Sequence, residues 1–265
     1  MELLKIERAL EELRRLKPLI FCLTNEVTMG FVANCLLAIG AAPIMSGDSA
    51  EFKELIELSS AIYINIGTLN QIFLEHIEVA TELGRRYGKP IVFDPVGAGA
   101  SEIRTDIGKK SLIFAGIIRG NASEIMALGG GAFSTFGVEA CDSVKDAEIA
   151  ATRMAKDHNV VVVVSGSEDF VTSGAKHCRV TYGSSMMKNV TGMGCALTAA
   201  VAAFRAVVPD SFDAARFATT YFGLCGQLCG QNSVGPGSFC VNFIDHLYGS
   251  QKLSCLAGVK LSGGC

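Results

Sequence analysis

Hydrophobic positions along the chain follow two spacings, one typical of strands and one typical of helices. Short apolar runs bounded by turn residues predict strands at residues 19–23, 42–45, 61–66, 91–93, 112–118 and 160–164. Between these runs, apolar residues recur every three or four positions, which is the period of an amphipathic helix. This period predicts helices at residues 3–16, 27–39, 50–59, 69–87, 121–128, 144–158, 195–208, 212–229 and 238–248.

The clearest strand is residues 160–164, where five valines stand in a row. A run that is apolar on both faces indicates a strand covered from both sides. Two short strands at 170–172 and 177–182 follow it. Strands that alternate with helices are typical of parallel βαβ units. We therefore expect a single α/β domain over residues 1–265, with a mostly parallel sheet, helices on both faces and a loose tail over 249–265.

The composition is that of a folded protein with a large core. Hydrophobic residues make up 49% of the 265 residues and charged residues 18%, which argues against disorder. The net charge of −3 provides no basic surface for nucleic acid. The N-terminus mixes acids and bases, unlike a signal peptide, and no apolar stretch reaches the ~18–20 residues of a membrane span. We expect a cytoplasmic protein without nucleic-acid or membrane partners.

Ten cysteines are scattered along the chain without a C-x-x-C pair, so the usual zinc spacings are missing. Cys225 and Cys229 lie one helical turn apart in an apolar segment. Reduced thiols behave as small hydrophobic groups. We therefore expect these two cysteines, and the helix at 212–230 that carries them, to belong to the core rather than to an interface.

The stretch N-V-T-G-M-G-C at residues 189–195 is followed at once by an alanine-rich apolar run. Glycine disfavours helix and alanine favours it, which predicts a glycine loop that opens a helix near Cys195. Such a helix start presents unpaired N–H groups and the positive end of the helix dipole. Without a Cβ at Gly192 or Gly194, an anion can approach the backbone closely. A loop that needs glycine only to turn would have the same sequence, and neither Walker A nor G-x-G-x-x-G is present.

Four polar residues follow the predicted strands or lie in the glycine loop. Asp94, Arg119 and Ser165 each come directly after an apolar run, and Thr191 lies in the loop. Ligands of open α/β sheets bind outside the carboxyl ends of the strands. Each residue has a structural alternative: Asp94 could be a turn residue, Ser165 a cap, and Arg119 a partner of Glu124.

Glu124 could itself complete a capping box with Asn121, three residues before it. Taken together, however, Asp94 and Glu124 supply two carboxylates for a hard cation, Arg119 supplies a guanidinium, and the glycine loop supplies N–H groups. Mg²⁺ bound to a nucleotide polyphosphate needs such groups. The residues by themselves therefore predict phosphoryl transfer.

Seven segments resemble, in order, the motifs of one enzyme family. They are T-N-E-V-T at 24–28, A-N at 33–34, A-A-P-I-M at 41–45, N-I-G-T at 65–68, D-P-V-G-A-G-A at 94–100, R-G-N-A-S-E-I at 119–125 and V-T-G-M-G-C at 190–195. The family is hydroxyethylthiazole kinase, a thiamine-salvage kinase with a ribokinase-like fold. The resemblance runs from about residue 17 to 239, and the motifs at 94–100 and 119–125 are specific to it.

The resemblance implies phosphorylation of the hydroxyl of 5-(2-hydroxyethyl)-4-methylthiazole by ATP and Mg²⁺, in a homotrimer with active sites between subunits. It implies that Cys195, Asp94 and Arg119 are the catalytic side chains. It also implies that Met45, Asn25 and Gly192 bind the thiazole and that Arg119 and Ser165 contact the ATP phosphates. Asp94 and Glu124 would hold magnesium, directly or through water. Thr191 and the amides of Gly194 and Cys195 would form a cradle for the transferred phosphoryl group.

Three positions differ from what the family or its superfamily usually has. Ser165 stands where the family often has Thr, which keeps the hydroxyl, and Met193 stands where a small or β-branched residue is usual, which could narrow the loop. Cys195 stands where the wider superfamily has an Asp base. A helix N-terminus is expected to lower the thiol pKa from about 8.5, so Cys195 could act as a weak base. We expect positioning and anion stabilisation to matter more.

Three other functions share part of this sequence pattern. A hydroxymethylpyrimidine or sugar kinase would share the site chemistry, but the apolar Val27, Phe31 and Ile44 near Met45 suit an aromatic heterocycle better than a sugar. A non-catalytic nucleotide-binding relative would not need all of the predicted site residues. A dehydrogenase is unsupported because no G-x-G-x-x-G follows the first strand.

Overall fold

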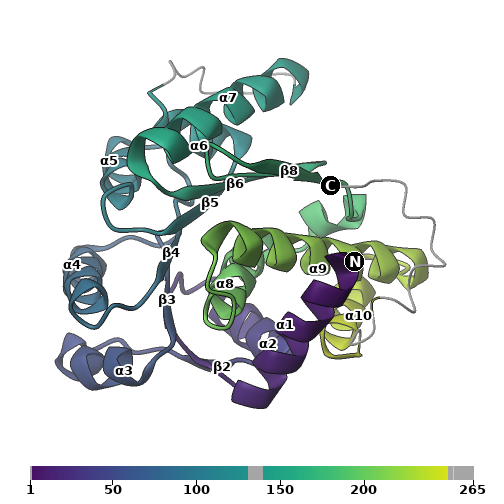
Figure 1. The fold of residues 1–265 in the computed structure, drawn as a ribbon, viewed down its shortest axis with the longest axis horizontal. Coiled ribbons are helices and arrows are strands. Elements are labelled where there is room, and N and C mark those ends of the chain that lie inside the picture. The colour runs from purple at the N-terminus through teal and green to yellow at the C-terminus, as the bar shows by residue number, and fades with distance from the viewer. Residues whose placement is uncertain (1, 131–139, 250–252, 254–265) are drawn as a thin grey trace.

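A computed structural model of the chain describes residues 2–130, 140–249 and 253, and its strands form one eight-stranded sheet (Figure 1). The strand order is β2-β1-β3-β4-β5-β6-β7-β8. Strands β1 to β6 pair in parallel, whereas β7 is antiparallel to both β6 and β8. The strands are β1 (Leu19–Leu23), β2 (Ala42–Ile44), β3 (Ala61–Asn65), β4 (Ile91–Asp94), β5 (Ile117–Asn121), β6 (Val161–Ser165), β7 (Asp169–Thr172) and β8 (His177–Val180).

Helices cover both faces of this sheet, as predicted (Figure 1). One layer consists of α1 (Glu2–Leu16), α2 (Met29–Ile39), α8 (Met193–Arg205), α9 (Ser211–Asn232) and α10 (Pro236–Gly249). The other layer consists of α3 (Phe52–Leu58), α4 (Gln71–Arg86), α5 (Glu102–Ser111), α6 (Ala122–Leu128) and α7 (Ala140–His158). Two 3₁₀ turns, η1 (Ser49–Glu51) and η2 (Ser185–Asn189), complete the described elements.

The valine run of β6 confirms that the sheet is buried on both faces. Val161 and Val163 belong to the core that contains α8 and α9. Val162 and Val164 belong to the opposite core, with residues of α6 and α7. Side chains of a strand alternate between faces, so a strand with a core on each side must be apolar at every position.

Helix α8 is buried along nearly its whole length. It packs against α9, against α2 and against β3 and β4, and its residues from Ala196 to Phe204 are all buried. A helix that is apolar all round belongs inside a protein, and its alanines allow its neighbours to approach closely. The helix begins at Met193, two residues before the predicted start, and its N-terminus reaches the carboxyl edge of the sheet.

The strand predicted at 112–118 is wrong in its first half. Helix α5 (Glu102–Ser111) precedes this segment, turns continue through Phe114, and the strand is β5 (Ile117–Asn121). The helix is capped by Ser101, whose Oγ accepts a hydrogen bond from Arg104 N at 3.5 Å. Few of its residues are buried, so it lacks the apolar period from which a helix is recognised.

The remaining differences concern helix ends and the tail. Helix α7 begins at Ala140 rather than at 144. The tail predicted over 249–265 falls outside the described residues, apart from Gly249, which ends α10, and Leu253, which is buried. Helix α9 is mostly buried, and its Cys225 and Cys229 are reduced cysteines in the core, as expected. None of the helices in the described ranges is long and apolar enough to cross a bilayer.

Candidate active site

The predicted site residues lie at one edge of the sheet, where the parallel strands β1 and β3–β6 end. Asp94 ends β4 and is in register with Asn65 at the end of β3. Arg119 lies in β5, and Ser165 ends β6 opposite Asn121. Asn25 follows β1, and its side chain is hydrogen-bonded to Asn65. The parallel pairing therefore brings together residues that are far apart in the sequence.

Asp94 is completely buried and only one of its two carboxylate oxygens is engaged. Its Oδ2 accepts hydrogen bonds from Thr198 Oγ1 at 2.7 Å and Asn65 Nδ2 at 3.1 Å, and lies 3.7 Å from Arg119 Nη1. Its Oδ1 is buried and has no hydrogen-bond partner within the described ranges. Burial, reinforced by the negative charge of Glu124, raises the pKa of Asp94 to about 7 against the opposing effect of Arg119. The free Oδ1 is thus an acceptor available to a cation or a proton.

Arg119 connects Asp94 to Ser165. Its Nη2 donates to Ser165 Oγ, while its Nη1 faces Asp94. The guanidinium is mostly buried, with 11% of the side chain exposed. Its ion pair is with Asp94 rather than with Glu124, so the pairing considered as an alternative is wrong. A buried guanidinium beside an open cavity is suited to bind phosphate oxygens.

Glu124 makes the capping box that its sequence suggested. Its Oε2 accepts from Asn121 N at 2.8 Å, and Asn121 Oδ1 accepts from Glu124 N at 2.9 Å. Its Oε1 accepts from Gly97 N at 2.9 Å, which ties the 94–100 loop to α6. A carboxylate oxygen has two acceptor positions, so this structural role leaves capacity for a further ligand.

The glycine loop closes the site from the side of α8. Gly192, the N-cap of α8, has a φ of 92°, a conformation that glycine adopts without strain. A Cβ there would lie 3.0 Å from Thr28 Cγ2 and 3.1 Å from the Phe31 ring. At Gly194 a Cβ would lie only 2.4 Å from Arg119 Nη1. The loop is therefore packed between the segment after β1 and the Arg119 guanidinium, with Thr191 exposed just before it.

Cys195 lies in the first turn of α8 and is half-buried. Its Sγ accepts a hydrogen bond from Asn25 Nδ2 at 3.4 Å. Burial and the negative charge of Asp94 raise the pKa of the Cys195 thiol, because both disfavour the thiolate. The lowered pKa expected from the helix N-terminus is therefore wrong, and the thiol is protonated at neutral pH.

Only some of the residues expected to bind the substrate lie together within one chain. Met45 directly follows β2 at the carboxyl edge of the sheet and, like Phe31, is half-buried against the core that contains α8. Ile44 packs instead on the opposite core. Val27 is 71% exposed. Of the apolar residues predicted near Met45, only Phe31 is therefore placed on the same face.

A cavity of about 560 Å³ opens beside Arg119 and Ser165. The apolar residues of its lining include Met187, Leu197 and Phe222. Asp169 also lines it; its Oδ1 accepts from Gly166 N at 3.0 Å, and burial raises the Asp169 pKa to about 6. A cavity of this size, lined by both polar and apolar residues, is typical of small-molecule sites.

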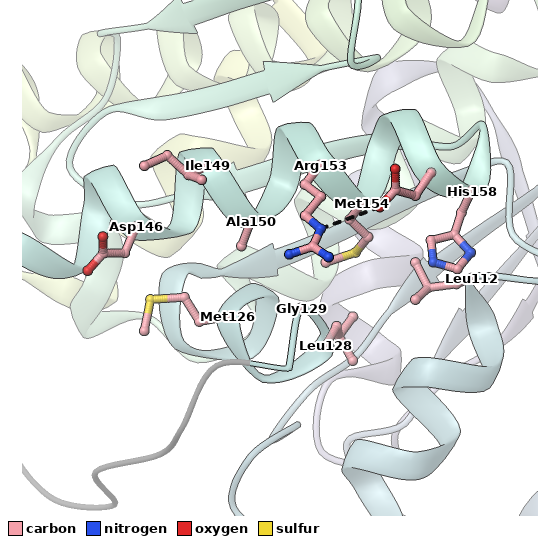
Figure 2. A pocket seen from close by; sticks show the side chains of 11 residues that line it. Leu112, Met126, Leu128, Gly129, Asp146, Ile149, Ala150, Arg153, Met154 and His158 are labelled. Atoms are coloured by element: carbon pink, nitrogen blue, oxygen red, sulfur yellow. Dashed lines mark ion pairs between the residues drawn. The ribbon is translucent and has the colours of Figure 1, made fainter.

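A second cavity, of about 530 Å³, lies between α6 and α7 (Figure 2). Arg153 and Asp157 form an exposed ion pair along its wall, at 3.5 Å. Its lining includes none of the predicted site residues. The chemistry predicted from the sequence is therefore confined to the carboxyl edge of the sheet.

Two residues of the site were missed by sequence reasoning. Asn65 and Thr198 both hydrogen-bond Asp94 Oδ2. Each is a polar residue in an otherwise apolar segment, and Thr198 is one helical turn from Gly194 and Cys195. That polarity within a buried strand and a buried helix was the signal that could have revealed them.

The model of the hydroxyethylthiazole kinase family matches residues 10–252. A hydroxyethylthiazole kinase of Chlamydia abortus is 47% identical over 93% of this chain and 95% of its own length. The structure of a hydroxyethylthiazole kinase protein from Pyrococcus horikoshii OT3 superposes with a TM-score of 0.85 and 36% identity, over 92% of both chains. A ribokinase-like superfamily protein from Enterococcus faecalis V583 shares the fold, with a TM-score of 0.66 and 11% identity over 91% of this chain and 93% of its own.

These similarities span nearly all of the chain, and the motifs that carry them surround the carboxyl edge of the sheet. The chain therefore belongs to the hydroxyethylthiazole kinase family.

Proposed function

We propose that this kinase transfers the γ-phosphoryl group of ATP to the hydroxyl of 5-(2-hydroxyethyl)-4-methylthiazole, with Mg²⁺ as cofactor. The observation that carries the proposal is the buried, unpartnered Oδ1 of Asp94 beside the Arg119 guanidinium and the N-terminus of α8. These groups offer an acceptor for a cation, a positive charge and backbone N–H donors within one small region. Phosphoryl transfer relies on such positioning and charge stabilisation.

The cavity beside Arg119 supports a nucleotide site. Of its lining residues, Arg119 and Ser165 suit phosphate oxygens, and the apolar Met187, Leu197 and Phe222 suit a base. The γ-phosphoryl group would then lie toward Gly194, which adjoins Arg119. The amides of Gly194 and Cys195 and the side chain of Thr191 are our candidates for its cradle.

Asp94 and Glu124 are our candidates for holding Mg²⁺. The two carboxylates lie close enough for the Glu124 charge to raise the Asp94 pKa, and a cation between them would relieve that repulsion. Over the described ranges no group of three or more His, Cys, Asp or Glu residues could hold a metal. Phosphates and water would therefore complete the coordination, as is usual for Mg²⁺. When bound, the ion neutralises charge on the phosphate oxygens.

The substrate alcohol would approach from the side of Met45, Asn25 and Gly192. Asn25 is fixed by Thr28, whose N and Oγ1 donate to its Oδ1 at 3.1 and 3.0 Å. The neutral Cys195 thiol contacts Asn25 Nδ2 and would orient rather than deprotonate the hydroxyl. A loose phosphoryl transition state needs little help from a base.

The decisive experiment measures ADP release from Mg-ATP with a panel of alcohols. We expect turnover with the thiazole alcohol and none above background with sugars or hydroxymethylpyrimidine. Faster turnover of a sugar or of the pyrimidine would instead identify another small-alcohol kinase. ATP binding without turnover of any alcohol would identify a non-catalytic relative.

Cys195→Asp is expected to keep or increase turnover of the thiazole alcohol. Burial and the Asp94 charge disfavour an anion here, but the helix dipole favours an acidic side chain in the first turn by about 0.3–1 kcal/mol, and a carboxylate accepts a hydrogen bond from Asn25 at least as well as a thiol. The measurement is kcat with saturating Mg-ATP, beside Cys195→Ala as the matched control. A loss from Cys195→Asp as large as that from Asp94→Ala would show that the thiol itself is indispensable.

We also propose a homotrimer in which a neighbouring subunit completes the substrate pocket. Val27 and Met29, beside the proposed substrate residues, are exposed apolar side chains, and burying each in an interface would contribute about 1–2 kcal/mol. Analytical ultracentrifugation should give three times the mass of 27.9 kDa. A monomer with full activity would contradict this arrangement.

A further inference from the structure

We propose that Asn65 is a positioning residue that couples the substrate side of the site, at Asn25, to the phosphate side, at Asp94. The inference rests on the proposed roles of those two residues. It concerns a side chain that touches neither substrate nor phosphate in that proposal. Asn65 is completely buried at the end of β3.

The Asn65 amide makes four hydrogen bonds. Its Oδ1 accepts from Asn25 Nδ2 at 2.9 Å and from Gly67 N at 2.9 Å. Its Nδ2 donates to Asp94 Oδ2 at 3.1 Å and to Tyr63 Oη at 2.9 Å. An amide has two donor protons and two acceptor lone pairs, so its capacity is fully used.

The orientation of this amide is set by its neighbours. The backbone N–H of Gly67 can only donate, so it must meet the Asn65 oxygen. The NH₂ group then necessarily faces Asp94 and Tyr63. Rotation of the amide would leave two buried groups opposed to groups of the same kind, which is unfavourable because a buried donor or acceptor then has no partner. Asn65 therefore holds Asp94 and Asn25 in one fixed relation.

Thr198 provides the contrast that isolates this role. Its hydroxyl also donates to Asp94 Oδ2, at 2.7 Å, and the only other hydrogen-bond contact of its Oγ1 among the described residues, to Gly194 O at 3.1 Å, lies within α8 and shares the same proton. Thr198 thus orients Asp94 without a contact to Asn25. If Asn65 only supported Asp94, losing it would resemble losing the Thr198 hydroxyl.

The experiment compares kcat and thiazole-alcohol KM for Asn65→Asp, Asn65→Leu and Thr198→Val in the full chain. Asn65→Asp keeps the acceptor for Asn25 and Gly67 but replaces the donor to Asp94 with a second carboxylate. The lost charged-group hydrogen bond, worth about 2 kcal/mol, and the added repulsion should lower kcat at least about 30-fold, with KM within about twofold. Asn65→Leu removes both the acceptor for Asn25 and the donor to Asp94, so kcat should fall at least as far and KM should rise about tenfold. Thr198→Val also removes a donor to Asp94 Oδ2 and should likewise lower kcat about 30-fold, but leave KM unchanged.

A double-mutant cycle supplies the second measurement. Combined with Asn25→Ala, Asn65→Leu should cost less in kcat/KM than the product of the single effects, because Asn25 has already lost its partner. The effects of Asn25→Ala and Thr198→Val on kcat/KM should instead multiply, because these two residues share no hydrogen bond in the part of the chain that the structure describes. Thermal melting checks that each variant is folded, and if Asn65→Leu is not, Asn65→Ala, which also removes both the donor and the acceptor, replaces it in the cycle with the same coupling expected.

The inference is overturned by Asn65→Asp with kcat within threefold of the unsubstituted protein. It is equally overturned if Asn65→Leu changes kcat and KM as Thr198→Val does, or if the effects of the single substitutions on kcat/KM multiply in both double-mutant cycles. An unsubstituted protein that fails to phosphorylate the thiazole alcohol would instead refute the proposed function.

Discussion

Asp94→Ala is expected to lower turnover of the thiazole alcohol by at least about 10³-fold. The substitution removes the buried Oδ1, which has no hydrogen-bond partner among the residues that the structure describes, and with it the proposed acceptor for Mg²⁺. It also leaves the Arg119 guanidinium, mostly buried, without its partner at 3.7 Å. The measurement is kcat at saturating substrate and Mg-ATP.

A measurement of nucleotide binding distinguishes a loss of catalysis from damage to the cavity beside Arg119. Arg119, Ser165 and the apolar wall remain in the variant, so ATP affinity measured by calorimetry without Mg²⁺ should change less than about tenfold. Asp94→Asn, which keeps the shape and an acceptor for Thr198 but not the charge, should be nearly as inactive. An Asp94→Asn variant with a tenth or more of the normal kcat would show that the charge is dispensable.

Gly194→Ala should lower kcat by about 10²-fold without destabilising the protein. A Cβ at this position would lie 2.4 Å from Arg119 Nη1, so the end of the Arg119 side chain must move away from Asp94 and Ser165. Gly194 lies inside α8, where Gly→Ala contributes about 0.5–1 kcal/mol of helix stability. Activity and melting temperature should therefore not fall together, and the two are measured on the same sample.

Gly237→Ala is the matched control for Gly194→Ala. Gly237 is also in a helix, α10, and a Cβ there would meet nothing within 4 Å. The Gly237→Ala variant should have a similarly increased helix propensity in α10 and an unchanged kcat. Normal turnover in Gly194→Ala would contradict the proposal that the close packing of α8 on Arg119 positions the guanidinium.

Most of the sheet could be predicted because its strands are apolar on both faces. The five valines at 160–164 indicate a strand covered from both sides, and Val161–Val164 form the apolar part of β6. The polar residues Asp94 and Ser165 were predicted to share an edge because parallel strands end together, and the register confirms that edge. Helix α5 could not be predicted in this way, since little of it is buried.

The contacts made inside the site depend on the tertiary structure. The sequence allowed Arg119 to pair with Glu124, but in the fold β4 and β5 place it beside Asp94, and Glu124 is used by Asn121 and Gly97. The pKa of Cys195 was predicted in the wrong direction because burial and the Asp94 charge depend on neighbours from other elements.

By itself, then, the sequence determined the order of most elements, the edge at which chemistry lies and the family, because these follow from local periodicity and from motifs of contiguous residues. Only the tertiary structure decided which buried groups meet: Asn25 with Asn65, Asn65 with Asp94, and Asp94 with Thr198 from α8. The physical reason is that hydrogen-bond partners and desolvation depend on side chains brought together from β1, β3, β4 and α8, and no local pattern in any one segment contains that information.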